Sequence, residues 1–126
     1  MNIFVFGSNR EGRHGKGAAL HAKIHHGAIN GQAEGLQGSS YAIITKELRR
    51  GQPPVTLDEV KAGVLTFLGF ARLNHRFTFN VTPIGCGLAG FKVSQIAPLF
   101  RGSPPNVVLP PEFALTPSQP EQREMQ

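Results

Sequence analysis

The stretch TPIGCGLAGF, residues 82–91, decides how the rest of the chain is interpreted. It follows FTFNV at 77–81, an alternating run typical of a buried strand, and it precedes residues 93–100, which have the pattern of a short helix. Three glycines, Gly85, Gly87 and Gly90, let the backbone approach a ligand closely. In open α/β sheets, loops of this kind at the carboxyl ends of strands bind ligands. A tight turn without a ligand is the alternative.

A second glycine-rich loop, GSNREGRHGKG at residues 7–17, follows the apolar run at 3–7 and leads into a helix expected over 16–26. Two such loops on one sheet predict one shared crevice. The P-loop motif does not fit, because Arg13 and His14 follow Gly12 in place of lysine and serine or threonine. The dinucleotide motif fails as well, since Leu20 stands where its third glycine belongs. What remains is a general anion site at the helix N-terminus beside Lys16.

Four strands are expected, at residues 3–7, 41–45, 77–82 and 106–109, with helices at 16–26, 56–74 and 94–100. Thr56 and Glu59 form a capping-box pattern at the start of the long helix, and Ser94 is the expected cap of the last one. Residues 28–40 are expected to be a loop. The alternation of strand and helix predicts a three-layer α/β/α fold with a mostly parallel, four-stranded sheet in the order 2-1-3-4. This domain spans residues 1–109, and the Pro/Gln/Glu-rich residues 110–126 are expected to form a loose tail.

The composition indicates a single globular domain, and its positive charge is compatible with an anionic ligand. The 126 residues carry 13 Lys and Arg against 8 Asp and Glu, a net charge of +5, which suits a phosphate, nucleotide or nucleic acid or simply keeps the surface soluble. No apolar run is long enough to span a membrane and no signal peptide is visible, so we expect a cytoplasmic protein. The single cysteine, Cys86, excludes an internal disulfide and a cysteine-based zinc site. His21 and His25 are four residues apart, but two ligands do not make a metal site.

Three blocks of the sequence resemble macrodomains, the ADP-ribose-binding α/β/α modules. They are VFGSNREGRHGKGAAL at 5–20, AEGLQGSSYAIITK at 33–46 and TPIGCGLAGF at 82–91. The run IGCGL at 84–88 and its spacing from ITK at 44–46 are similar to one branch of that family. This branch holds the terminal ADP-ribose glycohydrolases of proteins and the antitoxins that strip ADP-ribose from DNA.

The resemblance implies a catalytic role for Lys46. In that branch, a lysine at the ITK position attacks the ribose and an aspartate after IGCGL assists it. Lys46 matches the lysine, although a surface lysine at a strand end is the alternative, while Ala89 stands where the aspartate belongs. Macrodomains also read adenine with an acidic residue on a further strand upstream, which we expect to be absent here.

The implied ligand-binding residues come from both loops. Backbone N–H groups of the loop at 82–91 would hold the distal phosphate and ribose. Those of residues 15–18 would hold the other phosphate, and the side chain of Asn9 would bind the distal ribose. Phe91 either packs on that ribose or belongs to the core, and Cys86 is expected to be structural. The full set is Gly7, Ser8, Asn9, Gly15, Lys16, Gly17, Ala18, Ile84, Gly85, Cys86, Gly87, Leu88, Ala89, Gly90 and Phe91.

The expected function is therefore binding of ADP-ribose or a related nucleotide diphosphate between the two loops. Hydrolysis of ADP-ribose from a modified protein or nucleic acid is left open. We expect no cofactor, no metal ion and no membrane partner. One alternative is a nucleotide-binding module without catalysis. Another is a basic nucleic-acid-binding protein that uses Arg10, Arg13 and Lys16, although the first loop has no aromatic side chains on which bases would stack.

Overall fold

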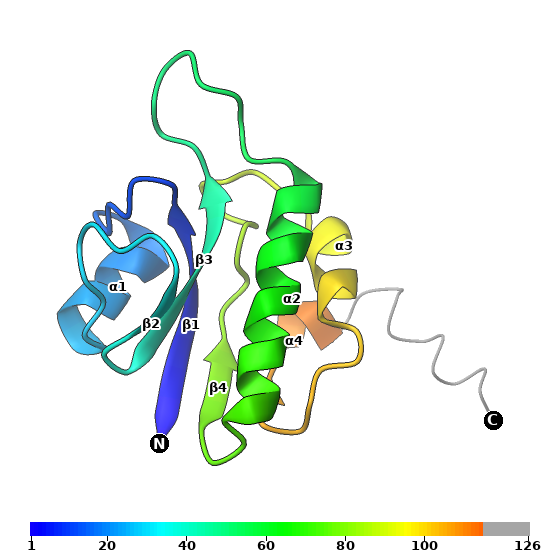
Figure 1. Ribbon diagram of the computed structural model, residues 1–126. Helices are drawn as coiled ribbons and strands as arrows, with labels where there is room; N and C mark the ends of the chain where they lie inside the picture. Colours follow the sequence, from blue (N-terminus) through cyan, green and yellow to red (C-terminus); the bar gives the residue numbers. More distant parts are fainter. Residues whose placement is uncertain (115–126) are drawn as a thin grey trace.

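The computed structural model describes residues 1–114, which form one β-sheet with helices on both faces (Figure 1). The strands are β1 (Asn2–Asn9), β2 (Gly35–Gln37), β3 (Ser40–Lys46), β4 (Thr78–Val81) and β5 (Val107–Val108). The helices are α1 (Gly17–His25), α2 (Leu57–Leu73), α3 (Val93–Ile96), the 3-10 helix η1 (Ala97–Phe100) and α4 (Pro111–Ala114). The sheet has the order β2-β3-β1-β4-β5, in which β2 runs antiparallel to β3 and the other pairs are parallel.

The α/β class expected from the sequence is confirmed, but the sheet has five strands and is mixed. The four expected strands correspond to β1, β3, β4 and β5, which lie in the order β3-β1-β4-β5. The fifth strand, β2, forms within residues 28–40, for which the sequence predicts a loop. Gly35 and Gly38 have positive φ angles of 89° and 60°, which let the chain turn on both sides of this short strand. Three residues carry no alternating apolar pattern, so the sequence gives no sign of it.

Strand β1 lies at the centre of the fold, and its side chains pack into a core on each face of the sheet. Ile3 and Val5 are fully buried in the larger core, together with residues of α2, α3 and η1. Phe6, on the opposite face, is buried against Ala19 and Ala22 of α1. Figure 1 shows the result, with α1 on one side of the sheet and α2, α3 and α4 on the other.

The long helix α2 begins as its sequence predicts, whereas α3 does not. The Glu59 N–H donates to Thr56 Oγ1 at 3.2 Å and the Thr56 N–H donates to Glu59 Oε1 at 2.9 Å, so the capping box is confirmed. Ser94 is not the cap of α3, because the helix begins one residue earlier. Lys92 is the N-cap there, and its N–H donates to Gln95 Oε1 at 2.8 Å.

The packed domain extends past residue 109. Phe113 of α4 is fully buried, and its ring lies 5.4 Å from that of Phe100, centroid to centroid. Residues 110–114 therefore belong to the folded unit rather than to the expected tail, and residues 115–126 lie outside the described part of the chain. In the described residues, no helix has the length and apolar character needed to cross a membrane.

The position of Phe113 makes the domain boundary testable. Because its ring is fully buried, Phe113→Ala leaves a cavity, and we expect the free energy of unfolding to fall by about 3–5 kcal/mol. Leu73→Ala is the control, since Leu73 is 84% exposed, and it should change stability by less than about 0.5 kcal/mol. Urea unfolding followed by circular dichroism measures both. Equal, small effects would mean that the domain ends before α4.

Candidate functional site

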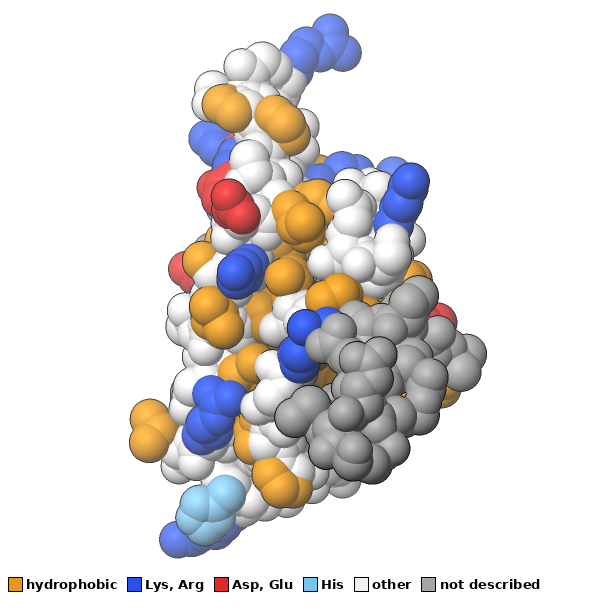
Figure 2. Space-filling view, turned by 90° about the vertical axis from the view of Figure 1, so that its right-hand side faces the viewer, with side chains coloured by type: hydrophobic (Ala, Val, Ile, Leu, Met, Phe, Trp, Pro, Cys, Tyr) orange, Lys and Arg blue, Asp and Glu red, His pale blue; other side chains and the backbone are white. Residues whose placement is uncertain are grey.

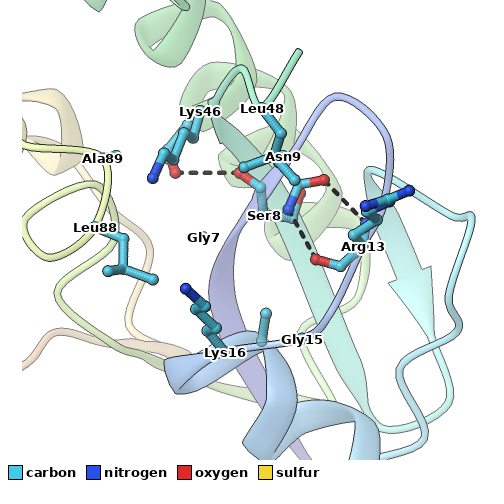
Figure 3. Close-up of a pocket in the computed structure, with 12 residues that line it drawn as sticks. Gly7, Ser8, Asn9, Arg13, Gly15, Lys16, Lys46, Leu48, Leu88 and Ala89 are labelled. Carbon is cyan, nitrogen blue, oxygen red and sulfur yellow. Dashed lines mark hydrogen bonds between the residues drawn. The ribbon is translucent and has the colours of Figure 1, made fainter. Parts of the chain in front are cut away.

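A cleft of about 390 Å³ opens at the carboxyl ends of β1 and β3 (Figure 3). Helix α1 follows β1 on one face of the sheet, and α2 connects β3 to β4 on the other, so the chain diverges at this point and leaves a crevice. The walls come from the loop after β1, the start of α1, the end of β3 and the loop between β4 and α3. The lining residues are Gly7, Ser8, Asn9, Arg13, Gly15, Lys16, Ala19, Thr45, Lys46, Leu48, Leu88 and Ala89.

The side chain of Asn9 closes the loop after β1. Its Nδ2 donates to the Arg13 carbonyl at 2.8 Å, and its Oδ1 accepts the Arg13 N–H at 2.9 Å, as Figure 3 shows. The strand register shifts between Ser8 and Asn9, opposite Lys46, and such irregularities commonly lie beside binding sites. Asn9 thus shapes the wall of the cleft, and both polar atoms of its amide are already bonded.

The floor of the cleft is largely backbone. The hydroxyl of Ser8 donates to the Ala33 carbonyl, and the hydroxyl of Thr45 donates to the Ser8 carbonyl at 3.2 Å. A Cβ placed on Gly7 would lie 3.0 Å from Thr45 Oγ1 and 3.4 Å from the Gly85 nitrogen. The missing side chain at Gly7 therefore lets the two glycine-rich loops approach each other.

The loop between β4 and α3 uses only part of its hydrogen-bonding capacity. Its chain reverses at Gly85, where φ is 74°. Four of its N–H groups donate to carbonyls of the same loop, those of Ile84, Cys86, Gly90 and Phe91. Within residues 1–114, no hydrogen bond is found for the N–H groups of Gly85, Gly87, Leu88 and Ala89. The segment 87–89 borders the cleft through Leu88 and Ala89, so it offers free donors beside it.

The start of α1 offers further donors. Lys16 is the N-cap, and its side chain makes no capping hydrogen bond. The first-turn N–H groups consequently have no side-chain partner and carry the partial positive charge of a helix N-terminus. Gly15, which has open space around its Cα, and Ala19 both line the cleft, so a ligand meets no bulky side chain between them.

The charged side chains that line the cleft in the described part of the chain are all positive. Arg13, Lys16 and Lys46 line it, and no carboxylate is among its lining residues in the described part of the chain. Figure 3 shows the amino groups of Lys16 and Lys46 extending from two different walls toward the segment that carries Leu88 and Ala89. Such a cleft attracts an anion and offers it N–H donors at close range.

Glu47, the acidic residue nearest Lys46 in the sequence, forms ion pairs with two arginines. Its side chain is only 2% exposed, and its Oε1 accepts from Arg10 Nη1 and from Arg49 Nη2, both at 2.9 Å. Hydrogen bonds from Arg49, and then from Arg10, lower the pKa of Glu47 to about 2. Arg10 also makes two hydrogen bonds to Glu59, at 3.0 and 2.9 Å. The guanidinium of Arg10 therefore has a structural role, and its ion pairs with Glu47 and Glu59 compete with any contact to a nucleic-acid phosphate.

The structure brings together about half of the residues that the sequence singles out. Those that line the cleft are Gly7, Ser8, Asn9, Gly15, Lys16, Lys46, Leu88 and Ala89. Those that do not are Gly17, Ala18, Ile84, Gly85, Cys86, Gly87, Gly90 and Phe91. Lining residues that sequence reasoning did not assign to the site are Arg13, Ala19, Thr45 and Leu48. The sequence could have identified them only by their position, since each lies within three residues of a residue that was assigned to the site.

Two of the side chains outside the cleft have structural roles. Phe91 packs against the larger core, which agrees with the core interpretation of this ring. Cys86 also packs there, its thiol donates to the Ile84 carbonyl at 3.4 Å, and burial raises its pKa, so it is poorly suited to act as a nucleophile. His21 and His25 lie 4.7 Å apart, ring centroid to ring centroid, but no cluster in residues 1–114 has the ligands to hold a metal ion.

Comparisons with known proteins add evidence on the fold. No family model and no curated protein matches the chain. The solved structure of a protein of unknown function from Bacteroides thetaiotaomicron is similar to it, with a TM-score of 0.54 and 21% sequence identity. The match covers 86% of this chain and 87% of that one, and at this identity it shows a shared fold alone.

The Glu47 ion pairs predict how stability depends on pH. The pKa of Glu47 is about 2 in the folded protein against an ordinary value of 4.5, so its pairing stabilises the fold fully above about pH 4.5. That contribution is lost as the pH falls through about 2. We expect Glu47→Gln to be less stable than the unmodified protein by a constant amount near neutral pH, with the difference shrinking below about pH 4.5.

Urea unfolding at a series of pH values measures this difference. Asp58→Asn is the control, because Asp58 is exposed and has no ion pair within residues 1–114. A difference for Glu47→Gln that stays constant down to about pH 3 would contradict the assignment.

Proposed function

We propose that this protein is a macrodomain-like module that binds ADP-ribose or a related nucleotide diphosphate in the cleft. One observation carries the proposal. Lys16 and Lys46 extend from two walls into a cleft that is bordered by unpartnered backbone N–H groups and lined by no carboxylate within the described residues. Fixed donors and cations without a competing acid are what phosphate groups require.

The size and position of the cleft agree with a small ligand. Its volume of about 390 Å³ lies within the range of roughly 300–1,000 Å³ that is usual for small-molecule sites. It lies at the carboxyl ends of parallel strands, the usual ligand position in sheets of this type. The similarity of residues 84–88 and 44–46 to macrodomain motifs is what favours ADP-ribose over other phosphorylated compounds.

Hydrolysis of ADP-ribose from a modified protein or nucleic acid is a second candidate function. It is favoured by one observation, the presence of half-buried Lys46 in the cleft. Against it, Ala89 occupies the position of the assisting aspartate, and it too lines the cleft. Glu47 offers no replacement, because its carboxylate is bonded to Arg10 and Arg49. Binding is therefore the better supported function, in a cytoplasmic setting and with an ADP-ribosylated macromolecule as the proposed partner.

General nucleic-acid binding is less well supported. Arg10, one of the three cations on which it depends, is held by Glu47 and Glu59. On the face shown in Figure 2, Lys and Arg side chains are scattered among hydrophobic and neutral ones rather than gathered into a stripe. A surface that follows a nucleic-acid backbone needs clustered positive charge.

Calorimetric titration with ADP-ribose tests the binding proposal. We expect saturable binding in the micromolar range, weaker for ADP and weakest for AMP, because fewer phosphate and ribose contacts form. Lys16→Ala should weaken ADP-ribose binding about ten-fold, the loss of one charged hydrogen bond. Lys61→Ala, on the exposed side of α2, is the matched control and should change nothing. Unaltered affinity in Lys16→Ala would place the ligand elsewhere.

Incubation with ADP-ribosylated protein and ADP-ribosylated DNA tests hydrolysis. If the cleft is catalytic, Lys46→Ala should abolish ADP-ribose release while lowering ADP-ribose affinity only about ten-fold, because one charged contact is lost. Chromatographic detection of free ADP-ribose is the measurement. The absence of turnover by the unmodified protein on both substrates would leave binding as the function.

A further inference from the structure

A buried histidine lies directly behind one wall of the cleft. Its neighbours in the loop after β1, Arg13 and Gly15, both line the cleft, whereas His14 does not and is only 1% exposed. The ring of His14 packs edge-on against Phe6 of β1, with the two ring centroids 5.2 Å apart. Its Nε2 lies 3.0 Å from Oε1 of Gln37 in β2. His14 therefore connects the wall of the cleft to two strands of the sheet.

The hydrogen bonds of Gln37 determine which nitrogen of the His14 ring carries the hydrogen. Gln37 is 2% exposed, and its Oε1 accepts the Ile29 N–H at 2.8 Å. Its Nε2 donates to the Gln32 and Gly35 carbonyls, at 3.2 and 3.3 Å. These partners fix the orientation of the amide, so the atom that faces His14 is an acceptor. The ring is therefore held with its hydrogen on Nε2, which donates to Gln37.

The other nitrogen of the ring makes no such bond. Nδ1 of His14 is buried and has no hydrogen-bond partner within residues 1–114. Burial of a polar atom without a partner costs free energy that an apolar side chain of the same size would not cost. Packing alone therefore does not account for a histidine at this position. What the imidazole adds is the directed hydrogen bond to Gln37.

We propose that His14 and Gln37 are positioning residues, and that the hydrogen bond between them sets where Gly15 and Lys16 lie in the wall of the cleft. The inference rests on the proposed function, because the N–H groups and the ammonium group of this wall are among those proposed to bind phosphate. Neither His14 nor Gln37 lines the cleft, so both act through the residues that do.

The same side of the loop is attached by two further hydrogen bonds. The His14 N–H donates to Asn30 Oδ1 at 3.0 Å, and the Gly31 N–H donates to a carbonyl of the loop at 2.8 Å. Gln37 also accepts the N–H of Ile29, the residue directly before Asn30. One side-chain amide therefore holds both the ring of His14 and the segment that supports the loop, which makes Gln37 the common point of this network.

Three substitutions of His14 separate its hydrogen bond from its packing. His14→Gln keeps an N–H donor near the place of Nε2, His14→Met has a similar volume without a donor, and His14→Asn keeps a polar group only near the place of Nδ1. Amide hydrogen exchange in the unliganded proteins is measured at residues 12–14, whose N–H groups donate to Asn9 and Asn30. We expect His14→Gln to keep their protection and the other two variants to lose about ten-fold of it, with unchanged protection in α2.

Calorimetric titration with ADP-ribose measures the consequence for the cleft. We expect His14→Gln to bind within about two-fold of the unmodified protein, and His14→Met and His14→Asn to bind about ten-fold more weakly, because a smaller fraction of the protein has the competent wall. His25→Gln is the matched control, since His25 is an exposed residue of α1 that does not line the cleft, and it should bind normally.

Every other outcome overturns the inference in a recognisable way. Equal protection and equal affinity in His14→Gln and His14→Met would assign the residue a packing role. Normal behaviour of His14→Asn together with a loss in His14→Gln would transfer the role to Nδ1. A loss of protection with unchanged affinity would show that this bond does not govern binding. Should His14→Met lose protection throughout the chain, the Gln and Asn variants alone decide.

Failure of the proposed function has a different signature. If the unmodified protein does not bind ADP-ribose, the proposed ligand is wrong. The exchange measurement needs no ligand, so it still decides whether the bond between His14 and Gln37 holds the wall of the cleft.

Discussion

The carboxylate of Glu47 is the constraint on which the geometry of the cleft depends. Arg10 and Arg49 lie against this side chain, which is 2% exposed, and hydrogen bonds from Arg49 and Arg10 lower its pKa to about 2. Arg10 also donates to the Pro53 carbonyl at 2.7 Å and to Glu59 in the capping box of α2. One guanidinium therefore connects the loop after β1, the end of β3 and the start of α2. Because Lys46 and Leu48 flank Glu47, the same ion pairs fix where both enter the cleft.

The sequence predicts the fold well where elements are long and buried, and poorly where they are short. A continuous apolar run indicates that β1 is buried on both faces of the sheet, and the residues of the capping box fix the start of α2. Strand β2 and helix α4 have three and four residues, too few for a periodic signal. Phe113 is buried because its ring contacts Phe100, and a contact between side chains of different elements leaves no local pattern in a Pro-rich segment.

The sequence likewise predicts where the candidate site lies, but not which residues line it. The glycine-rich loops locate the crevice, because a strand that leads into such a loop has a recognisable local pattern. Which loop residues face the cleft depends instead on bonds between distant segments. Asn9 folds the first loop so that Arg13 lines the cleft, and the Glu47 ion pairs bring Leu48 to its mouth. In the second loop, Gly85 and Phe91 contribute to the turn and the core, and Leu88 and Ala89 line the cleft.

The feature that makes the cleft a good anion site also limits its chemistry. Release of a sugar through a lysine nucleophile requires a second group that accepts or delivers a proton in step with the attack. Among the described residues, the cleft presents cations and backbone donors but no carboxylate, and the neighbouring Glu47 is bonded to two arginines. An acid at the position of Ala89 would supply the proton transfer, yet it would also repel the phosphate groups of the proposed ligand. With alanine there, the lining of the cleft is better suited to the proposed binding of ADP-ribose than to its hydrolysis.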